Sequence, residues 1–357
     1  SKTMANYNIF IFVFLISGLL SFIITKLVII LAKRWNIIDQ PQGGRKIHSR
    51  ATPLLGGLAI YLALAITAFV LWQNNLLFDF RVDQQVVFWF FVAGLLLVIN
   101  GILDDKYRLP AKFSIWGPIL AAVIVILAGL KISYITHPDG GVLYLDNFVN
   151  NGWLWVSGLL TFAWLMAMTY TTKLLDGIDG LASSIGLIAA LIIFAVSLSW
   201  DVSGSTTSLL VLGFAGALLG FLIWNWHPAK IFLGEGGSTL IGFTLGVLAI
   251  ISGSKIATAL LVMGLPILDI IWVIIRRLRQ KKAIWRGDSG HLHFRLLKAG
   301  FSQQQIVFFL GFISLLFGLV SIMFTTRAKI GALAILLAIM FLLTYWLNFK
   351  TKQNENT

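Results

Sequence analysis

The chain has 357 residues, of which 58% are hydrophobic and only 11% are charged. A soluble globular domain carries about 25% charged residues, so this composition excludes a soluble domain and indicates an integral membrane protein. The sequence contains no cysteine, which excludes disulfides and thiolate metal sites. The formal net charge of +13 indicates nucleic-acid binding only if membrane topology leaves that charge unexplained.

Eleven apolar segments follow one another along the chain, each close to the length of about 17–25 residues that crosses a bilayer. They cover residues 8–32, 54–72, 86–103, 113–130, 153–171, 181–199, 207–225, 238–253, 256–275, 305–324 and 330–348. We therefore predict an all-α polytopic membrane protein with about eleven transmembrane helices. It is expected to form one membrane-embedded domain over residues 1–357, with a polar tail at 349–357.

The distribution of Lys and Arg predicts the orientation of the chain in the membrane. The tail and the loops that follow odd-numbered segments contain 20 of these residues, whereas the other side contains six. Since loops rich in Lys and Arg stay in the cytoplasm, the N-terminus is expected outside and the C-terminus in the cytoplasm. Topology thus accounts for the positive charge, and nucleic acid is not expected as a partner.

Four motifs with carboxylates follow helix ends on the predicted cytoplasmic side. The first, "NGILDDKYRLPAK", places Asp104 and Asp105 at the end of the third segment and Lys112 at the start of the fourth. Adjacent carboxylates repel each other unless a cation or a shared proton relieves them, which makes this pair a candidate base or metal ligand. A solvated turn that caps two helices is the alternative interpretation.

The second motif, "KLLDGIDGLASS", carries Lys173, Asp176 and Asp179 between two apolar segments. Its glycines allow the backbone to approach a ligand closely. Asp179 is a candidate cap for the next helix. Capping accounts for one Asp, but it does not account for the second Asp together with Lys173.

The third motif, "NWHPAKIFLGEGGS", follows the seventh segment and contains Asn225, Phe232 and Glu235 beside a Gly-Gly turn. Glycine-rich turns join many helices, so the turn alone is weak evidence of a site. The Phe232 ring is suited to stacking on a base, and packing in the core is the alternative role for such a side chain.

The fourth motif, "RRLRQKKAIWRGDSGHLHFRLLKAG", begins with basic residues that anchor a helix at the cytoplasmic surface. Its second half brings Asp288, His291 and His293 together with Arg. Zinc would need a fourth ligand that this segment lacks, so His and Arg here favour an anionic phosphate. Asp269 differs from the other acids because it falls within the ninth segment. Such an intramembrane carboxylate keeps a transporter as a rival interpretation.

Five motifs in a fixed order carry a resemblance to a known family, and they read "RKIHSRATPLLGGLAI", "GILDD", "LLDGIDGLA", "NWHPAKIFLGEGGS" and "DSGHLHF". Over about residues 33–300 the chain resembles the polyprenyl-phosphate N-acetylhexosamine-1-phosphate transferases, glycosyltransferase family 4. The resemblance implies a reaction in which undecaprenyl phosphate attacks the β-phosphate of a UDP-sugar. UMP leaves and a lipid-linked pyrophosphoryl sugar forms, normally with Mg²⁺.

The same resemblance implies a multi-pass protein of the bacterial cytoplasmic membrane, in contact with membrane lipid, that serves the first membrane step of cell-envelope polysaccharide synthesis. A homodimer is left open. "DSGHLHF" and eleven segments are more similar to the WecA/TagO-type enzymes, which use UDP-GlcNAc, than to the MurNAc-pentapeptide transferases. Transfer of MurNAc-pentapeptide or another modified UDP-HexNAc is the enzymatic alternative. An inactive relative that binds the lipid carrier is the alternative outside the enzymes.

The resemblance also implies roles for individual residues. One of Asp104 and Asp105 is expected to deprotonate or orient the lipid phosphate, which Lys112 would hold, and Glu235 occupies the metal-binding position. Residues expected around the nucleotide-sugar, with Phe232 stacking on the uracil, are Lys46, His48, Asp176, Asp179, Asn225 and Phe232. Residues expected around the diphosphate or sugar are Arg286, Asp288, His291, His293 and Arg295.

Three positions depart from the family pattern. Lys173 stands where the family usually has Asn, Glu235 where it usually has Asp, and Phe294 where it often has a second His. Mg²⁺ requires near-octahedral oxygen ligands, and an ammonium at a ligand position repels it. We hypothesise that Lys173 supplies part of the positive charge that Mg²⁺ otherwise gives. The alternative is that Lys173 pairs with Asp176 or Glu235 while the metal shifts slightly.

Overall fold

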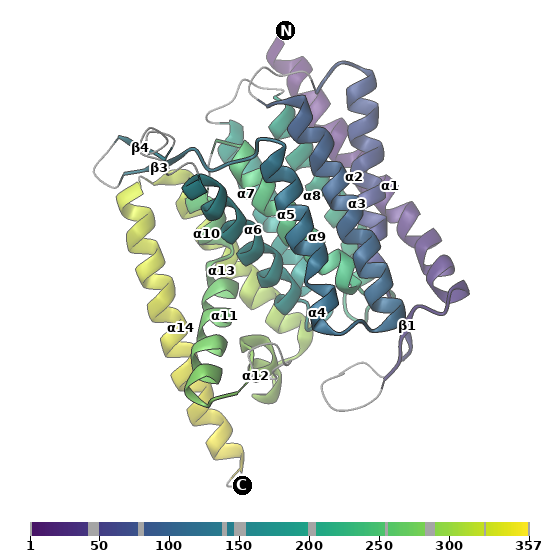
Figure 1. The fold of residues 1–357 in the computed structure, drawn as a ribbon. Coiled ribbons are helices and arrows are strands. Elements are labelled where there is room, and N and C mark those ends of the chain that lie inside the picture. Colours follow the sequence, from purple (N-terminus) through teal and green to yellow (C-terminus); the bar gives the residue numbers. More distant parts are fainter. Residues whose placement is uncertain are drawn as a thin grey trace.

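The computed structural model describes residues 2–41, 50–77, 82–137, 141–145, 155–198, 205–253, 256–282, 290–324 and 326–355. Helices account for most of these residues (Figure 1). They are α1 (Lys2–Arg34), α2 (Gly56–Gln73), α3 (Gln84–Tyr107), α4 (Ala111–Ser114), α5 (Trp116–Leu127), α6 (Trp155–Leu175), α7 (Leu181–Leu198), α8 (Thr206–Asn225), α9 (Gly234–Ile251), α10 (Ile256–Val262), α11 (Gly264–Arg279), α12 (Leu292–Lys298), α13 (Gln303–Met323) and α14 (Thr326–Glu355).

Two short antiparallel ribbons complete the described structure. β1 (Ile38–Asp39) pairs with β2 (Thr52–Pro53), and β3 (Tyr134–Thr136) pairs with β4 (Val142–Tyr144). Apart from these ribbons, the all-α prediction is confirmed. Every predicted apolar segment coincides with a helix or with a pair of helices.

Among the described residues, eight helices are long and apolar enough to cross a membrane, and the bent pair α10 and α11 would make a ninth. The multi-pass character is therefore confirmed, while the count of eleven crossings and the orientation stay predictions. The two termini lie at opposite ends of the helix bundle (Figure 1). This placement is the one that an odd number of crossings requires.

Two predicted segments are not single straight helices. Segment 113–130 is divided into α4 and the 12-residue α5, with the break at Ile115. Segment 256–275 is divided into α10 and α11, which are bent by 74°. Pro266 has no N–H to donate to the carbonyl four residues earlier, so it cannot continue a regular helix across this bend. At the C-terminus, α14 continues as a helix to Glu355 and so includes most of the predicted polar tail.

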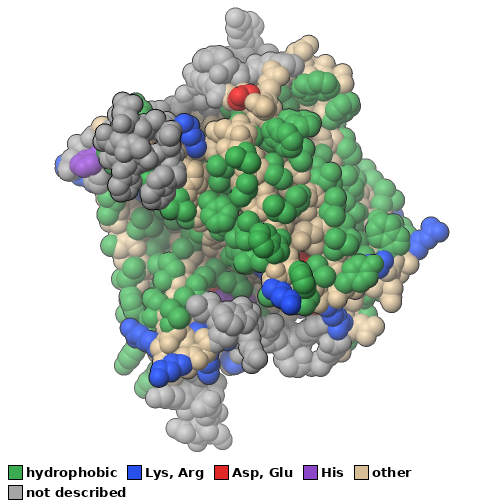
Figure 2. Space-filling model, viewed as in Figure 1, with side chains coloured by type: hydrophobic (Ala, Val, Ile, Leu, Met, Phe, Trp, Pro, Cys, Tyr) green, Lys and Arg blue, Asp and Glu red, His purple; other side chains and the backbone are tan. Residues whose placement is uncertain are grey.

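The surface of the bundle has the pattern of a protein in a bilayer. A continuous apolar belt covers the middle of the face in Figure 2, and most Lys and Arg side chains on that face lie near the end that holds the C-terminus. Large apolar side chains are exposed on the described helices, including Phe88, Leu127 and Phe312, which are 62%, 82% and 65% exposed. In water such exposure would be unfavourable, whereas lipid tails solvate it.

Small residues let the central helices approach each other closely. On α8, a side chain added at Gly216 or Gly220 would meet the backbone of α1. On α9, a side chain at Gly242 would meet the Met168 carbonyl of α6. Because lipid removes the hydrophobic drive between helices, such close backbone packing is the main source of their association. The central α9 thus lies firmly against the helices that carry the polar motifs.

Candidate active site

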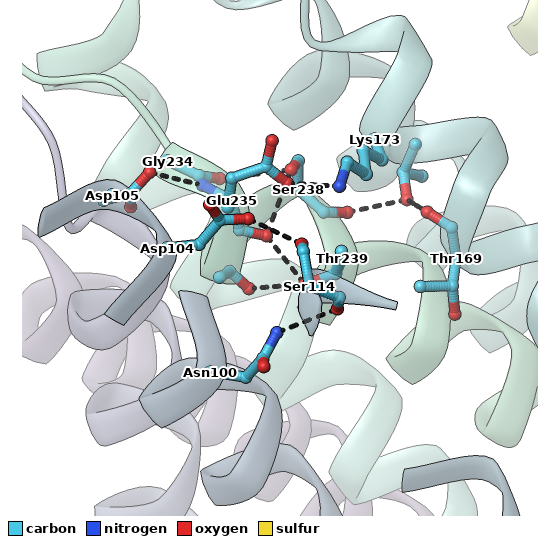
Figure 3. A network of polar contacts seen from close by, with 12 residues as sticks. Asn100, Asp104, Asp105, Ser114, Thr169, Lys173, Gly234, Glu235, Ser238 and Thr239 are labelled. Atoms are coloured by element: carbon cyan, nitrogen blue, oxygen red, sulfur yellow. Dashed lines mark hydrogen bonds and ion pairs between the residues drawn. The ribbon is translucent and has the colours of Figure 1, made fainter. Parts of the chain in front are cut away.

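Three of the sequence motifs meet where α3 and α6 end and α9 begins (Figure 3). Asp104 and Asp105 lie in the last turn of α3, Lys173 lies in the last turn of α6, and Glu235 lies in the first turn of α9. The same end of the bundle carries α12 and the C-terminus (Figure 1). The structure therefore brings three of the four carboxylate motifs together through these four residues.

Asp105 anchors the start of α9. Its Oδ1 accepts a hydrogen bond from the backbone N–H of Glu235 over 3.1 Å. Gly234 has φ of +71°, and a side chain there would meet Oδ2 of Asp105. A carboxylate at a helix N-terminus satisfies an unpaired N–H and is favoured by the helix dipole. The contacts of Asp105 therefore position Glu235.

Asp104 has a different environment one residue away. Its Oδ2 accepts a hydrogen bond from the Ser114 hydroxyl over 2.6 Å, and the Ser114 carbonyl accepts one from Asn100 over 3.2 Å. The residue is 9% exposed. A short hydrogen bond to an ionised acceptor is a strong one, so Ser114 fixes the direction of the Asp104 carboxylate.

Lys173 and Glu235 form an ion pair, with Nζ 2.7 Å from Oε2. Their side chains are 24% and 37% exposed, whereas the Oε2 atom that meets the ammonium is buried. Close by, the Thr172 hydroxyl donates to the Ser238 carbonyl over 2.7 Å and joins α6 to α9. Of the two carboxylates that the alternative interpretation names as partners of Lys173, the structure pairs it with Glu235.

Asp176 follows α6 in the turn that leads to α7, and it is partly buried. Burial raises the pKa of its carboxyl to about 8, and the negative charges of Glu235 and Asp179 add to the effect. At neutral pH the carboxyl is therefore mostly protonated and able to donate a hydrogen bond. A cation or a phosphate that enters the site would change the pKa of the Asp176 carboxyl.

Asp179 joins three parts of the chain. Its Oδ2 lies 2.7 Å from Nδ1 of His227 and accepts a hydrogen bond from the backbone N–H of Ala229 over 3.0 Å. Its own N–H donates to the Gln303 side chain of α13 over 2.9 Å. These contacts replace the helix cap that the sequence suggested. Asp179 fixes the loop between α8 and α9 against α7 and α13.

Asn225 has a similar positioning role at the end of α8. The residue is 2% exposed, its amide donates to the Ile231 carbonyl over 3.0 Å, and its Oδ1 accepts the Ser183 hydroxyl. The backbone of Phe232 bonds to Pro53 and Gly56, and its side chain is partly buried. Asn225 therefore shapes the loop before α9.

The two histidines of the fourth motif are buried beside Asp269. Nδ1 of His291 lies 2.9 Å from Oδ2 of Asp269, and the backbone N–H of Leu292 donates to Oδ1 over 2.9 Å. The His291 and His293 rings lie parallel with centroids 5.8 Å apart. Asp269 thus has a structural role, which removes the observation that favoured a transporter.

His293 is 1% exposed, and within the described part of the chain its Nε2 is buried without a hydrogen-bond partner. This nitrogen faces Gly177, where an added side chain would meet it. Burial, together with the neighbouring His291, lowers the pKa of His293 to about 3. Its imidazole is therefore neutral at physiological pH.

The low pKa of His293 predicts loss of stability in acid. Because the pKa in the folded state, about 3, is below that of an unfolded His, about 6.5, the contribution to stability is complete above pH 6.5 and is lost as the pH falls toward 3. The loss is about 1.4 kcal/mol for each pH unit in this window. Unfolding of detergent-solubilised protein at pH 7 and pH 5 measures it. His293→Gln should show a smaller pH difference, and an equal difference would contradict the prediction.

Several predicted residues have other surroundings. Lys112 is exposed, with Nζ 5.1 Å from the centroid of the Phe113 ring. The Arg295 guanidinium donates to the Thr344 carbonyl over 2.8 Å and to Asn348 over 2.9 Å, so it joins α12 to α14 and these contacts do not place it at the diphosphate. Predicted residues that lie outside the described residues are Lys46, His48, Arg286 and Asp288.

Two comparisons place the chain among known proteins. The model of glycosyl transferase family 4 matches residues 87–253. The chain is also 32% identical over 310 residues to the probable undecaprenyl-phosphate N-acetylglucosaminyl 1-phosphate transferase of Bacillus subtilis, which covers 84% of this chain and 81% of that protein. The chain belongs to glycosyl transferase family 4. The resemblance carried by the motifs is thereby confirmed.

Other relatives are similar to the chain over comparable lengths. The decaprenyl-phosphate N-acetylglucosaminephosphotransferase of Mycolicibacterium smegmatis is 34% identical over 321 residues, 82% of this chain and 76% of that protein. The phospho-N-acetylmuramoyl-pentapeptide-transferase of Oceanobacillus iheyensis is 28% identical over 300 residues, 80% of this chain and 86% of that protein. The two relatives named for N-acetylglucosamine are thus the more similar of these three.

Enzymes of this family are generally dependent on Mg²⁺, but the described residues do not fit a preformed magnesium site. Within the described ranges, no three His, Asp or Glu side chains lie close enough to hold one ion together. Glu235, which occupies the expected metal-binding position, is already paired with the Lys173 ammonium. Mg²⁺ requires several well-placed oxygen ligands. The ammonium and a Mg²⁺ ion would both use the Glu235 carboxylate, so the ion pair competes directly with metal binding.

Proposed function

We propose that the chain transfers GlcNAc-1-phosphate from UDP-GlcNAc to undecaprenyl phosphate and releases UMP. The observation that carries this proposal is the cluster of Asp104, Asp105, Lys173 and Glu235 at adjoining helix ends. The chain is also similar to relatives named as N-acetylglucosamine phosphate transferases of undecaprenyl phosphate and decaprenyl phosphate. Carboxylates beside a cation suit phosphoryl transfer, in which positioning and charge neutralisation provide most of the catalysis. The site lies at a helix-end surface that a half-lipid substrate can reach.

In the proposed reaction, a phosphate oxygen of the lipid attacks the β-phosphorus of UDP-GlcNAc. The bond between this phosphorus and the oxygen that bridges to the α-phosphorus breaks, and UMP leaves with the bonding electrons. Asp104 accepts the proton that remains on the lipid phosphate, since Ser114 holds its carboxylate in one direction. A positioned base of this kind typically contributes about 10²–10⁴-fold to the rate.

The remaining roles come from the contacts of the described residues and, for the UDP-sugar, from the resemblance carried by the motifs. Asp105 holds the first turn of α9, and Asp179 and Asn225 hold the loop before it. Exposed Lys112 at the start of α4 is assigned to the lipid phosphate. Residues that the resemblance assigns to the UDP-sugar are Lys46, His48, Lys173, Asp176, Phe232, Arg286, Asp288, His291 and His293.

We place this reaction at the cytoplasmic face of a bacterial cytoplasmic membrane, as the first membrane step of cell-envelope polysaccharide synthesis. The excess of Lys and Arg in the predicted cytoplasmic loops supports that orientation. The whole chain acts as one membrane-embedded transferase domain in this proposal.

The sugar is tested by supplying purified protein with undecaprenyl phosphate and one radiolabelled UDP-sugar at a time. We expect label from UDP-GlcNAc to enter the organic-extractable lipid at least about tenfold faster than label from UDP-GalNAc or UDP-MurNAc-pentapeptide, because a site that binds sugar substituents rejects altered ones. Preferential transfer of MurNAc-pentapeptide would contradict the choice of sugar. It would leave the type of reaction intact.

A further inference from the structure

Lys173 is the cation that the structure places within a group of carboxylates. Its Nζ lies 2.7 Å from Glu235, and it also interacts electrostatically with Asp104. Asp105 and Asp176 lie close enough to Glu235 for their like charges to repel one another. Four acidic side chains from three parts of the chain thus share a site with one ammonium.

The ammonium is held in this position by its surroundings. Lys173 lies in the last turn of α6, next to Thr172, whose hydroxyl bonds to the Ser238 carbonyl of α9. The Lys173 Nζ also lies 5.8 Å from the centroid of the Tyr170 ring. A cation that contacts both a carboxylate and an aromatic ring is stabilised by both. Lys173 is therefore a fixed charge of the site.

A fixed ammonium at Glu235 has a consequence for metal binding. A divalent ion that used Glu235 as a ligand would have to displace the ammonium or remain close to it, and like charges at such separations repel strongly. Lys173 already neutralises the carboxylate that would attract the ion. The family is generally dependent on Mg²⁺. In this chain, however, the Glu235 carboxylate at the expected metal position is already paired with an ammonium.

We propose that Lys173 is a built-in cation that takes the place of a divalent ion at Glu235 and faces the diphosphate of the bound UDP-sugar. The role toward the diphosphate rests on the proposed function, whereas the exclusion of a divalent ion from Glu235 does not. With Lys173 in place, the protein binds divalent ions weakly at this site. Without the ammonium, Glu235 and its acidic neighbours become a metal site.

Binding of Mn²⁺ to the purified, detergent-solubilised protein tests this inference without any substrate. Electron paramagnetic resonance of free Mn²⁺ gives the affinity for wild type, Lys173→Asn and Lys173→Met. We expect both variants to bind Mn²⁺ at least about tenfold more tightly than wild type, because a neighbouring positive charge has been removed. Lys106→Asn is the matched control, since Lys106 is exposed beside Asp105 with its Nζ over Tyr107. It should change the affinity by less than about twofold.

UMP release supplies the second readout. Wild type should keep most of its activity in chelator, whereas Lys173→Asn should depend strictly on added Mg²⁺. If wild type releases no UMP with or without Mg²⁺, the proposed function fails, and the Mn²⁺ measurement still decides the role of Lys173.

Equal Mn²⁺ affinity in wild type and in folded Lys173→Asn would overturn the inference. If neither uncharged variant folds, wild type is compared with Glu235→Gln and Lys173→Arg. Weak Mn²⁺ binding that neither substitution changes supports a site already filled by a cation. Tight Mn²⁺ binding by wild type that Glu235→Gln abolishes would show that Glu235 holds a metal despite Lys173, and would overturn the proposal.

Discussion

Asp104→Asn is expected to lower lipid-dependent UMP release by about 10²–10⁴-fold, the contribution of a positioned general base. The amide has the shape of the carboxylate and still accepts a hydrogen bond from the Ser114 hydroxyl, which lies 2.6 Å from Oδ2 in the native chain. The substitution therefore removes the capacity to accept a proton while it preserves the packing. Initial rates and the melting temperature of the purified variant measure both effects, and only the rate should change.

Asp105→Asn is the matched control in the same helical turn. The amide oxygen can still accept the Glu235 N–H that binds Oδ1 in the native chain, so α9 should keep its position. We expect a smaller loss of rate than in Asp104→Asn. A larger loss in Asp105→Asn than in Asp104→Asn, with both proteins folded, would identify Asp105 as the base and contradict the assignment of Asp104.

Gly101→Ala is expected to disrupt the site from a distance. The added methyl group would meet the backbone nitrogen and Cα of Gly236, where α3 and α9 are in contact. Backbone atoms cannot rotate away as a side chain can, so α9 must shift relative to α3. Overpacking of this kind costs about 1–3 kcal/mol or more. The shift separates Glu235 from Asp105, and a displacement of about 1 Å at a catalytic site can lower the rate by about 100-fold.

Gly331→Ala on α14 is the control for this substitution. An added side chain at Gly331 meets no atom within 4 Å, so neither the melting temperature nor UMP release should fall. Both variants are measured for UMP release and for thermal unfolding. Unfolding is monitored with a dye that does not react with thiols, because the chain has no cysteine. A Gly101→Ala protein with wild-type stability and rate would show that the close contact of α3 with α9 does not position the site.

The positions of the helices could be predicted because the bilayer imposes a long apolar run on each crossing. The interruptions within helices could not. The break at Ile115 lies in an apolar sequence that would also suit a continuous helix. The 74° bend between α10 and α11 depends on how these helices pack, although Pro266 signals that a regular helix is difficult there.

The candidate site was predictable where the chemistry of a motif and its place at a helix end coincide. Asp104, Asp105, Lys173 and Glu235 are charged residues at the ends of apolar helices, and these ends meet. Ser114 was missed because one hydroxyl in "LPAKFS" carries no signal of its own. Its distance of ten residues from Asp104 becomes a contact only through the turn between α3 and α4.

Other roles depend on contacts between distant segments, which no local pattern contains. Asp269 looked like an intramembrane charge until the structure placed it against His291, 22 residues later. Arg295 looked like a phosphate ligand, yet its guanidinium bonds to Thr344 and Asn348 of α14. Each of these polar groups has several acceptable partners in chemical terms. The fold selects among those partners.

UMP release by the purified wild-type protein with UDP-GlcNAc, in the presence and absence of undecaprenyl phosphate, shows directly whether the chain is a polyprenyl-phosphate transferase. We expect release that requires the lipid and matches, mole for mole, the lipid-linked pyrophosphoryl sugar formed. Asp104→Asn in the same assay should release almost none. Absence of UMP from folded wild-type protein, or release that is independent of the lipid, would contradict a polyprenyl-phosphate transferase.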